Sequence, residues 1–355
     1  MKILFLYTEV AAYFLACAET LHTLYGCEVH IVRWPVNEEA PFRFREYQGV
    51  RFYERREMGE KEMLDLFHEI SPDLVYVTGW MDKGYLKVAG KIKGEGVPVV
   101  CALDNHWRGD LRQRIATLIS PLMLKKRFTH TFVPGRFQYE FARRLGFSPD
   151  RILTGMYSAD VTPFHEAFSR FSEDKKTNWP HNFLYVGRII DVKGIKELCQ
   201  AFLQLKEELS HDWTLTLVGK GNAANDWLNQ EGMIHLDFVQ PENLPDLVET
   251  AGCFVLPSRN EPWGVVLHEF AAAGLPLIAA ENVGAASAFL KTGYNGYTHQ
   301  PGSVFSIKEA MRNIIHVPDE KLLVMGERSY ELSRQITPEI WASTLFMTAK
   351  TFTKN

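Results

Sequence analysis

The feature that most constrains the fold is an alternation of short apolar runs and helical patterns, repeated along both halves of the chain. In the first half, apolar runs at 2–7, 73–79 and 98–104 are each followed by residues with helical spacing. A buried strand followed by a helix is the building unit of a parallel sheet with helices on both faces. The fold class is therefore predicted to be α/β and doubly wound, with ligand groups at the carboxyl ends of the strands.

The alternation is interrupted once, between residues 158 and 181. Pro163, a charged run at 173–178 and the Trp179-Pro180 pair break the regular patterns there. Because 355 residues are many for a single core, the interruption predicts a boundary between two domains. The expected organisation is a first domain at 1–160, a linker at 161–181, a second domain at 182–337 and an amphipathic C-terminal helix at 338–355.

Composition limits the classes of function. With 46% hydrophobic residues, 23% charged residues and a formal net charge of −4, the chain is typical of a globular protein, and generic nucleic-acid binding is not favoured. Its apolar runs are too short for a membrane span. The five cysteines form no Cys-x-x-Cys pair and are interpreted as buried thiols of a reducing compartment, so a cytoplasmic location is expected.

The first candidate site is the segment 258–274, which follows an apolar run at 253–258. The pattern indicates a strand, a Pro-Trp-Gly turn and then a helix. The first N–H groups of a helix have no partner within the helix and attract anions. The backbone groups in that position belong to Gly264, Val265 and Val266.

Two carboxylates flank this anion site, Glu261 before the turn and Glu269 inside the helix. A carboxylate does not bind phosphate directly, but it accepts hydrogen bonds from hydroxyl groups. The arrangement therefore suits a diphosphate that carries hydroxyl groups at both ends, as a nucleotide sugar does.

The second candidate site is the segment 185–194, where Arg188 and Lys193 lie five residues apart on a strand-to-helix loop. Two cations on such a loop can converge on an anion at the carboxyl edge of the sheet. Since both candidate segments follow strands of one domain, we expect them to meet at the same edge.

With these motifs, the second half resembles the donor-binding domain of glycosyltransferase family 4, whose members are retaining enzymes with the GT-B fold. The resemblance rests on six motifs in the family's order. They are G-R-x4-K-G at 187–194, L-V-G-K-G at 217–221, P-S-x2-E-P-W-G at 257–264, the Glu-x7-Glu pair, A-A-G-L-P-L-I at 272–278 and G-Y-N-G-Y at 293–297.

The resemblance implies two tandem Rossmann-like domains that face a central cleft, with a C-terminal helix that can cross back to the first domain. It also implies transfer of a sugar from a nucleotide-diphospho-sugar to a glycan or lipid-linked acceptor, with retention of configuration and without a cofactor. By matching position, the donor diphosphate is held by Arg188, Lys193 and the backbone of Gly264, Val265 and Val266.

The remaining donor contacts follow from the same match. Glu269 is expected to bind the ribose, and Glu261 is expected to contact the sugar as a catalytic residue. Contacts to the base are expected near two segments, which contain Gly219 with Lys220 and Phe238 with Val239.

The first half departs from the family pattern. Its first strand-to-helix loop has Ala11-Ala12 where many members carry two glycines, which puts close approach of the backbone to phosphate in doubt. Where the family has a His-Asp pair after a later strand, this chain reads D-N-H-W at 104–107. Either Asp104 takes the place of the histidine, which we favour, or the loop shifts and His106 serves.

No motif with metal-ligand spacing occurs, so no metal is expected. The alternatives left open are a nucleotide-sugar epimerase or phosphorylase of the same architecture, and a non-catalytic binding protein. A nicotinamide-dependent oxidoreductase is disfavoured, because the glycine-rich segment 219–224 lies late in the second domain and no acidic residue follows at the required spacing.

Charge is unevenly distributed. Residues 108–151 carry ten Lys or Arg against three Asp or Glu, although the whole chain is acidic. The stretch has three interpretations: a solvated basic face, a patch for an anionic membrane surface, or a site for an acceptor phosphate. Our hypothesis is peripheral contact with the inner face of a membrane through residues 108–128.

Overall fold

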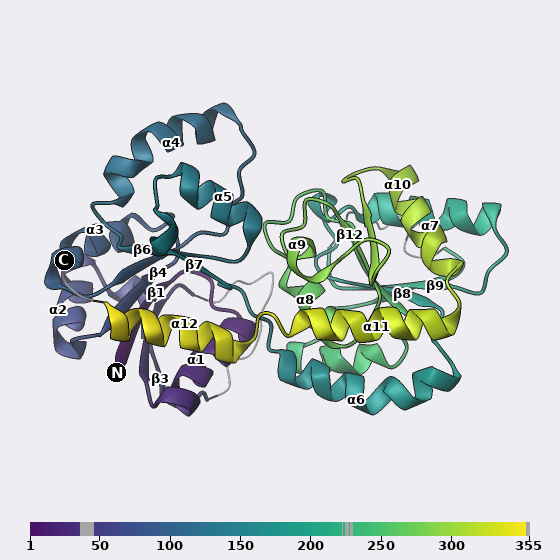
Figure 1. Cartoon of the computed structure of the whole chain (residues 1–355), viewed down its shortest axis with the longest axis horizontal. Helices are drawn as coiled ribbons and strands as arrows, with labels where there is room; N and C mark the ends of the chain where they lie inside the picture. The colour runs from purple at the N-terminus through teal and green to yellow at the C-terminus, as the bar shows by residue number, and fades with distance from the viewer. Residues whose placement is uncertain (36–45, 222, 224–226, 228–229, 353–355) are drawn as a thin grey trace. The chain divides into compact units, whose positions relative to one another are not determined.

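The computed structural model describes residues 1–35, 46–221, 223, 227 and 230–352, and the chain divides into two compact units (Figure 1). Unit 1 contains Met1–Asp160 and Ile336–Asn355, and unit 2 contains Val161–Gln335. Each unit has a parallel β-sheet, with seven strands in unit 1 and six in unit 2.

The sheet of unit 1 has the strand order β3-β2-β1-β4-β5-β6-β7. Its strands are β1 Lys2–Tyr7, β2 Glu28–Arg33, β3 Val50–Glu54, β4 Leu74–Val77, β5 Val99–Ala102, β6 His130–Val133 and β7 Ile152–Thr154. Its helices are α1 Ala12–Tyr25, α2 Glu60–Ile70, α3 Lys83–Ile92, α4 Leu111–Leu124, α5 Arg136–Arg144 and α12 Pro338–Thr351, with short 3-10 turns at Arg55–Glu57, Lys93–Glu95 and Pro149–Arg151.

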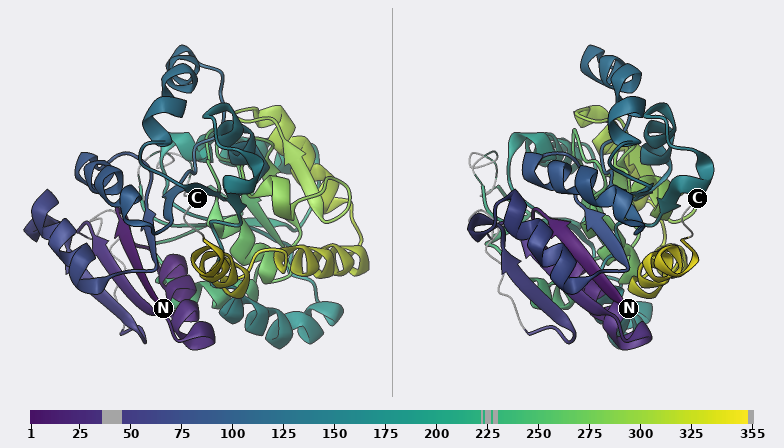
Figure 2. Two further views of the ribbon diagram at one scale, coloured as in Figure 1. Left: turned by 60° about the vertical axis from the view of Figure 1, so that its left-hand side comes forward. Right: turned by 90° about the vertical axis from the view of Figure 1, so that its left-hand side faces the viewer.

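Alternate residues of β1 enter different cores, as the period of a strand requires. Leu4 and Leu6 pack with α2, α3 and α5, whereas Ile3 and Phe5 pack with α1 and α12. Figures 1 and 2 show α1 and α12 side by side on one face of the sheet. The apolar residues of β1, β4, β5 and β6 are buried on one face of the sheet or the other, as in a parallel sheet covered on both faces.

The C-terminal helix crosses back to unit 1, as the resemblance implied. Trp341 of α12 is buried, and its ring stacks on that of Phe5 with 6.0 Å between centroids. Its indole N–H donates to the carbonyl of Met156 over 2.9 Å. The end of the chain is therefore part of the core of the first unit.

The sheet of unit 2 has the strand order β10-β9-β8-β11-β12-β13. Its strands are β8 Asn182–Val186, β9 Thr214–Val218, β10 Met233–Leu236, β11 Cys253–Leu256, β12 Leu277–Ala280 and β13 Gly296–His299. Its helices are α6 Val161–Thr177, α7 Ile195–Glu208, α8 Val265–Ala272, α9 Ala286–Phe289, α10 Val304–Ile315 and α11 Asp319–Ser333, with 3-10 turns at Asp191–Lys193 and Pro241–Val248.

The linker expected at 161–181 differs in the structure, because most of it is helix α6 of unit 2. Pro163 lies in the first turn of α6. The backbone N–H groups of a first turn have no acceptor within the helix, so a proline there removes no helical hydrogen bond. Phe164 is buried and meets Phe270 of α8 edge-on at 5.7 Å. The charged run that suggested a linker belongs mainly to the outer face, although Lys175 is buried and its Nζ donates to Ala251 O over 2.7 Å.

In each sheet the strands are first added toward one edge and then, from a single switch point, toward the opposite edge. In unit 1 this switch lies between β1 and β4, and in unit 2 it lies between β8 and β11. Loops leave neighbouring strands in opposite directions there, and ligands of doubly wound sheets bind outside the carboxyl ends of those strands. The segments after β8 and β11 are the two candidate sites found in the sequence.

We expect the stability of unit 2 to fall when the pH is lowered from 7 to 5, because of His268 in α8. Its ring is buried, stacks on Phe289 at 4.1 Å and contacts Ser333 O over 2.9 Å. Burial lowers its pKa to about 4, whereas an unfolded histidine has a pKa of about 6.5. The unfolded state thus binds more protons below pH 6.5, which costs about 2 kcal/mol at pH 5. Urea unfolding at the two pH values measures this loss, and a His268→Gln variant should lose less; equal losses in both proteins would contradict the assignment.

Candidate functional site

The loop between β8 and α7 brings Arg188 and Lys193 to the carboxyl edge of the second sheet. Tyr185 donates its hydroxyl to Arg188 O over 2.8 Å, and Arg188 is exposed. Gly194 has φ +71°, and a Cβ there would collide with Pro257 O. Only glycine permits this close approach, so the loop after β8 lies directly against the segment after β11.

The centre of the site is an ion pair between Lys193 Nζ and Glu261 Oε2. Their side chains are 18% and 14% exposed, so water screens the pair poorly. Ser258, two residues after the end of β11, donates its hydroxyl to the same carboxylate oxygen over 3.3 Å. Two residues predicted from separate motifs are therefore in contact.

A second ion pair, which sequence reasoning missed, fixes the same two loops. Arg259 pairs with Glu197 of α7, whose side chain is 8% exposed. Arg259 N also donates to Val192 O over 2.9 Å, and its carbonyl accepts from Asn282 over 2.7 Å. Glu197 could have been found from helical spacing, because it stands four residues before Ala201, a buried position of α7.

The helix predicted after the Pro-Trp-Gly turn is α8, which begins at Val265. Gly264 precedes it with φ +92°, a conformation that favours glycine. The turn is held by two backbone bonds, from Gly284 N to Glu261 O over 3.3 Å and from Ala285 N to the carbonyl of the buried Trp263 over 2.9 Å. The first N–H groups of α8, at Val265 and Val266, precede any intrahelical acceptor and carry the positive end of the helix dipole.

Glu269 lies in α8, four residues after Val265, and is half-buried. At about 1.5 Å per residue this is roughly 6 Å along the axis from the start of the helix. The two glutamates thus belong to different parts of the site, one in the turn and one on the helix.

The candidates for base contact lie after β9 and β10. Gly219 N donates to Leu236 O over 2.9 Å, and Ile189 N donates to Lys220 O over 2.7 Å, which joins this segment to the loop after β8. A Cβ on Gly219 would collide with the carbonyl of Gly187, so glycine is required there. Two half-buried residues that follow β10 at the same edge of the sheet are Phe238 and Val239.

In unit 1, Asp104 follows β5 and is half-buried. Its carboxylate accepts from the hydroxyl of Tyr157 over 3.3 Å and from the side-chain amide of Asn105 over 3.2 Å. Burial raises the pKa of Asp104. His106 is half-buried, which lowers its pKa, and its ring lies 6.4 Å from that of Phe137. Both residues stand on the loop after β5, and the choice between them stays a prediction.

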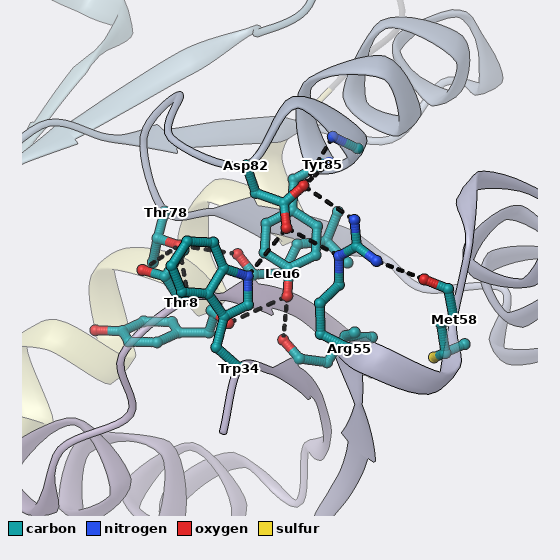
Figure 3. Close-up of polar contacts among 11 residues, drawn as sticks. Leu6, Thr8, Trp34, Arg55, Met58, Thr78, Asp82 and Tyr85 are labelled. Carbon is teal, nitrogen blue, oxygen red and sulfur yellow. Dashed lines mark hydrogen bonds and ion pairs between the residues drawn. The ribbon is translucent and has the colours of Figure 1, made fainter. Parts of the chain in front are cut away.

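A hydrogen-bonded cluster at the switch point of unit 1 was not foreseen (Figure 3). Asp82 accepts from Arg55 Nε over 2.9 Å, from Trp34 Nε1 over 3.0 Å and from two N–H groups at the start of α3. Beside it, Thr78 Oγ1 accepts from Thr8 N over 3.0 Å. The cluster joins segments that follow β1, β2, β3 and β4, so it shapes the loops at this edge.

The comparisons with known proteins agree with this geometry. The family model described as "Glycosyl transferases group 1" matches residues 168–332, which include every candidate residue of unit 2. These residues are a glycosyltransferase group 1 domain.

The glycosyltransferase group 1 domain has curated relatives. Glycogen synthase of Mycobacterium tuberculosis is 31% identical over 157 residues, which are 42% of this chain and 37% of that enzyme. The chain therefore spans well under half the length of that relative. N-acetyl-alpha-D-glucosaminyl L-malate synthase of Bacillus anthracis is 23% identical over 310 residues, 83% of this chain and 77% of that enzyme.

Solved structures show the same architecture around this domain. Anabaena Alr3699/HepE in complex with UDP and glucose has a TM-score of 0.73 at 16% identity and covers 99% of this chain and 100% of its own. Sucrose-phosphate synthase of Thermosynechococcus elongatus has a TM-score of 0.74 at 16% identity, with 99% and 98% covered. These structures confirm the GT-B fold, and the family model and curated relatives confirm the resemblance to glycosyltransferase family 4.

The described part of the chain contains neither a membrane-spanning helix nor a metal-binding cluster. Among those residues, no helix combines the length and apolarity needed to cross a membrane. Within the same residues, no group of three or more His, Cys, Asp or Glu side chains is placed to hold a metal ion.

Proposed function

We propose that the chain is a retaining hexosyltransferase, which moves a sugar from a nucleotide-diphospho-sugar to a glycan or lipid-linked acceptor. The observation that carries the proposal is the ion pair of Lys193 and Glu261 at the switch point of unit 2, next to the N-terminus of α8. The pair supplies one cation for a diphosphate and one carboxylate for hydroxyl groups in the same place. Support also comes from similar folds whose structures contain UDP or UDP-glucose.

The donor diphosphate gives Lys193 a second anion to contact. Its ammonium group has three N–H donors, so it can bind a phosphate oxygen and still touch Glu261. Arg188 and the amides of Gly264, Val265 and Val266 complete the phosphate contacts. Glu261 then turns its second oxygen to a sugar hydroxyl, and Glu269 accepts from the ribose.

Transfer breaks the bond between the anomeric carbon and the diphosphate oxygen and forms a bond from that carbon to the acceptor oxygen. The proton of the acceptor hydroxyl passes to a phosphate oxygen of the leaving nucleoside diphosphate. Negative charge grows on the leaving diphosphate as the first bond breaks. Lys193 is held by its contact with Glu261, and the N-terminus of α8 is fixed by the helix, so both stabilise that charge without rearranging. Arg188 adds a further cation from the loop after β8. Glu261 places its own negative charge where the sugar becomes positive.

Unit 1 is expected to contribute one catalytic residue near the transferred sugar. That residue is Asp104 or His106. We also propose that the protein is cytoplasmic and contacts the inner face of an anionic membrane through residues 108–128. All five cysteines are buried free thiols, which supports a reducing compartment.

Incubation with a donor and observation by NMR tests the proposed reaction class. UDP-, GDP- and ADP-hexoses are supplied one at a time, with and without a mixture of glycan and lipid-linked acceptors. We expect one donor to yield its nucleoside diphosphate, with faster release when an acceptor is present. Conversion of an intact donor to its epimer without acceptor would instead identify an epimerase.

We expect transfer to continue in EDTA, because the proposed site meets the leaving charge with protein groups alone. The rate with a chelator should equal the rate without it within about twofold, less than about 0.5 kcal/mol of barrier. Complete loss of transfer in EDTA, followed by recovery on adding Mn²⁺, would contradict this.

A further inference from the structure

Helix α4 of unit 1 buries polar side chains and exposes apolar ones. The residues that it buries are Gln113, Ser120 and Leu124. The amide group of Gln113 accepts from Arg108 N over 2.6 Å and donates to His106 O over 2.8 Å. Ser120 donates to Leu145 O over 3.3 Å. The inner face is thus attached largely through hydrogen bonds, the reverse of an ordinary surface helix.

The outer face of α4 is a continuous apolar surface, which we call the α4 face. It consists of Leu111, Ile115, Leu118, Ile119, Leu122 and Met123, exposed by 73%, 49%, 80%, 50%, 72% and 49%. At about 100° per residue these positions fall within an arc of roughly 140°, on the side away from the buried residues. A contiguous exposed apolar surface of this kind marks an interaction site.

Cations flank the α4 face at both ends. Arg108, Arg112 and Arg114 lie at its start, and Lys125, Lys126 and Arg127 follow its end. Asp110 is the only acidic residue between 108 and 128, and its carboxylate caps α4 by accepting from Gln113 N over 2.8 Å. Figures 1 and 2 show α4 at the outer edge of its unit.

We propose that α4 lies in the plane of an anionic lipid bilayer surface and inserts the α4 face among the acyl chains. This specifies how the membrane contact of the proposed function is made. It rests on the proposed function, because the contact would serve to reach a lipid-linked acceptor. The α4 face supplies the apolar contact, and its flanking cations meet anionic headgroups, each cation adding about 1 kcal/mol near such a surface.

The two kinds of contact separate this partner from others. In a symmetric dimer the α4 faces of two copies would meet and bring their flanking cations together, which the repulsion of like charges opposes. A purely electrostatic partner would need no row of exposed leucines. Only a surface that is both anionic and apolar underneath uses the whole helix.

The test is flotation of the purified chain with vesicles of phosphatidylcholine alone and with added phosphatidylglycerol. The disrupting variant is Leu118→Glu with Leu122→Glu. Its matched control is Leu24→Glu with Phe305→Glu, which adds the same charge at two other exposed apolar residues, 51% and 69% exposed. A third variant, Lys125→Gln with Lys126→Gln, removes two cations.

We expect the wild type and the control to float with phosphatidylglycerol vesicles and not with phosphatidylcholine alone. The Leu118/Leu122 variant should bind at least about tenfold more weakly. The lysine variant should also bind more weakly than the wild type, by a difference that narrows as the salt concentration is raised. Equal flotation of the Leu118/Leu122 variant, no flotation of the wild type at low salt, or a wild-type dimer that this variant converts to a monomer would each overturn the proposal.

The same preparations are tested for thermal stabilisation by nucleotide sugars. The Leu118/Leu122 variant should respond to a donor as the wild type does, since α4 belongs to unit 1 and the donor residues belong to unit 2. Flotation without a donor response would count against the proposed function alone, and a donor response without flotation would count against the membrane proposal alone.

Discussion

Replacing Lys193 with alanine is expected to lower kcat/KM for transfer by on the order of 10²–10³-fold. The substitution removes a cation from the leaving diphosphate, and it also leaves the carboxylate of Glu261 poorly hydrated without its partner. Both effects act on the transition state, so we expect kcat to fall as well as donor affinity. Initial rates of nucleoside diphosphate release over a range of donor concentrations measure the two separately.

The matched control for this variant is Lys196→Ala. Lys196 is on α7, close to Lys193 in the sequence, but it is half exposed and pairs with Asp191 over 3.2 Å. Its loss should change the rate by less than about twofold. Similar rates for the Lys193 and Lys196 variants would remove Lys193 from the site.

Replacing Glu261 with glutamine is expected to slow transfer by about 10²-fold, or about 2.7 kcal/mol of barrier. Glutamine keeps the size of the side chain and one acceptor oxygen, so the substitution isolates the negative charge. Because Lys193 loses its intramolecular partner, donor affinity should change less than turnover. Steady-state kinetics of this variant check the split between kcat and KM.

Glu249→Gln is the control here, since Glu249 is an exposed residue of the same unit. A Glu261→Gln rate within about twofold of the wild type, less than about 0.5 kcal/mol, would exclude a role for the charge. The transfer rate of the variant that carries both Lys193→Ala and Glu261→Gln should fall by less than the product of the two single losses. The reason is that the effects of residues in contact are not additive.

Much of the fold was predictable because local patterns and long-range packing agree. The apolar run at 253–258 reads as a buried strand, and β11 is buried on both faces at the centre of its sheet. The turn after it was predictable for a local reason: Gly264 adopts a positive φ that few other residues tolerate. Sequence spacing therefore located the start of α8 and, with it, the candidate anion site.

Two segments could not be predicted correctly, because the sequence does not show which of their side chains face the core. Residues 161–181 carry a proline and a charged run, and their assignment to helix α6 depends on the contact of Phe164 with Phe270, which are far apart in the sequence. The stretch 118–128 was recognised as apolar and then cationic. Only the structure shows that Leu118 and Leu122 face outward while Ser120 faces inward.

The candidate site shows the same division. Arg188, Lys193 and Glu261 were found from motifs because each follows a strand of one sheet. The pair of Arg259 and Glu197 was missed, since a charge on a helix is usually solvated and its partner lies on a separate loop. The contact of Lys193 with Glu261 also needed the structure, because a close approach at Gly194 brings the loops together.

Thermal unfolding of the chain with UDP-, GDP- and ADP-sugars tests the central claim most directly. A donor at 100 times its dissociation constant stabilises the folded protein by about 2.7 kcal/mol, which corresponds to a rise in Tm of about 5–10 °C for a domain of this size. We predict such a rise for at least one donor with the wild type and with Lys196→Ala, and a much smaller rise with Lys193→Ala. No rise with any of these donors, or an equal rise in the Lys193→Ala variant, would contradict a donor site at Lys193 and Glu261.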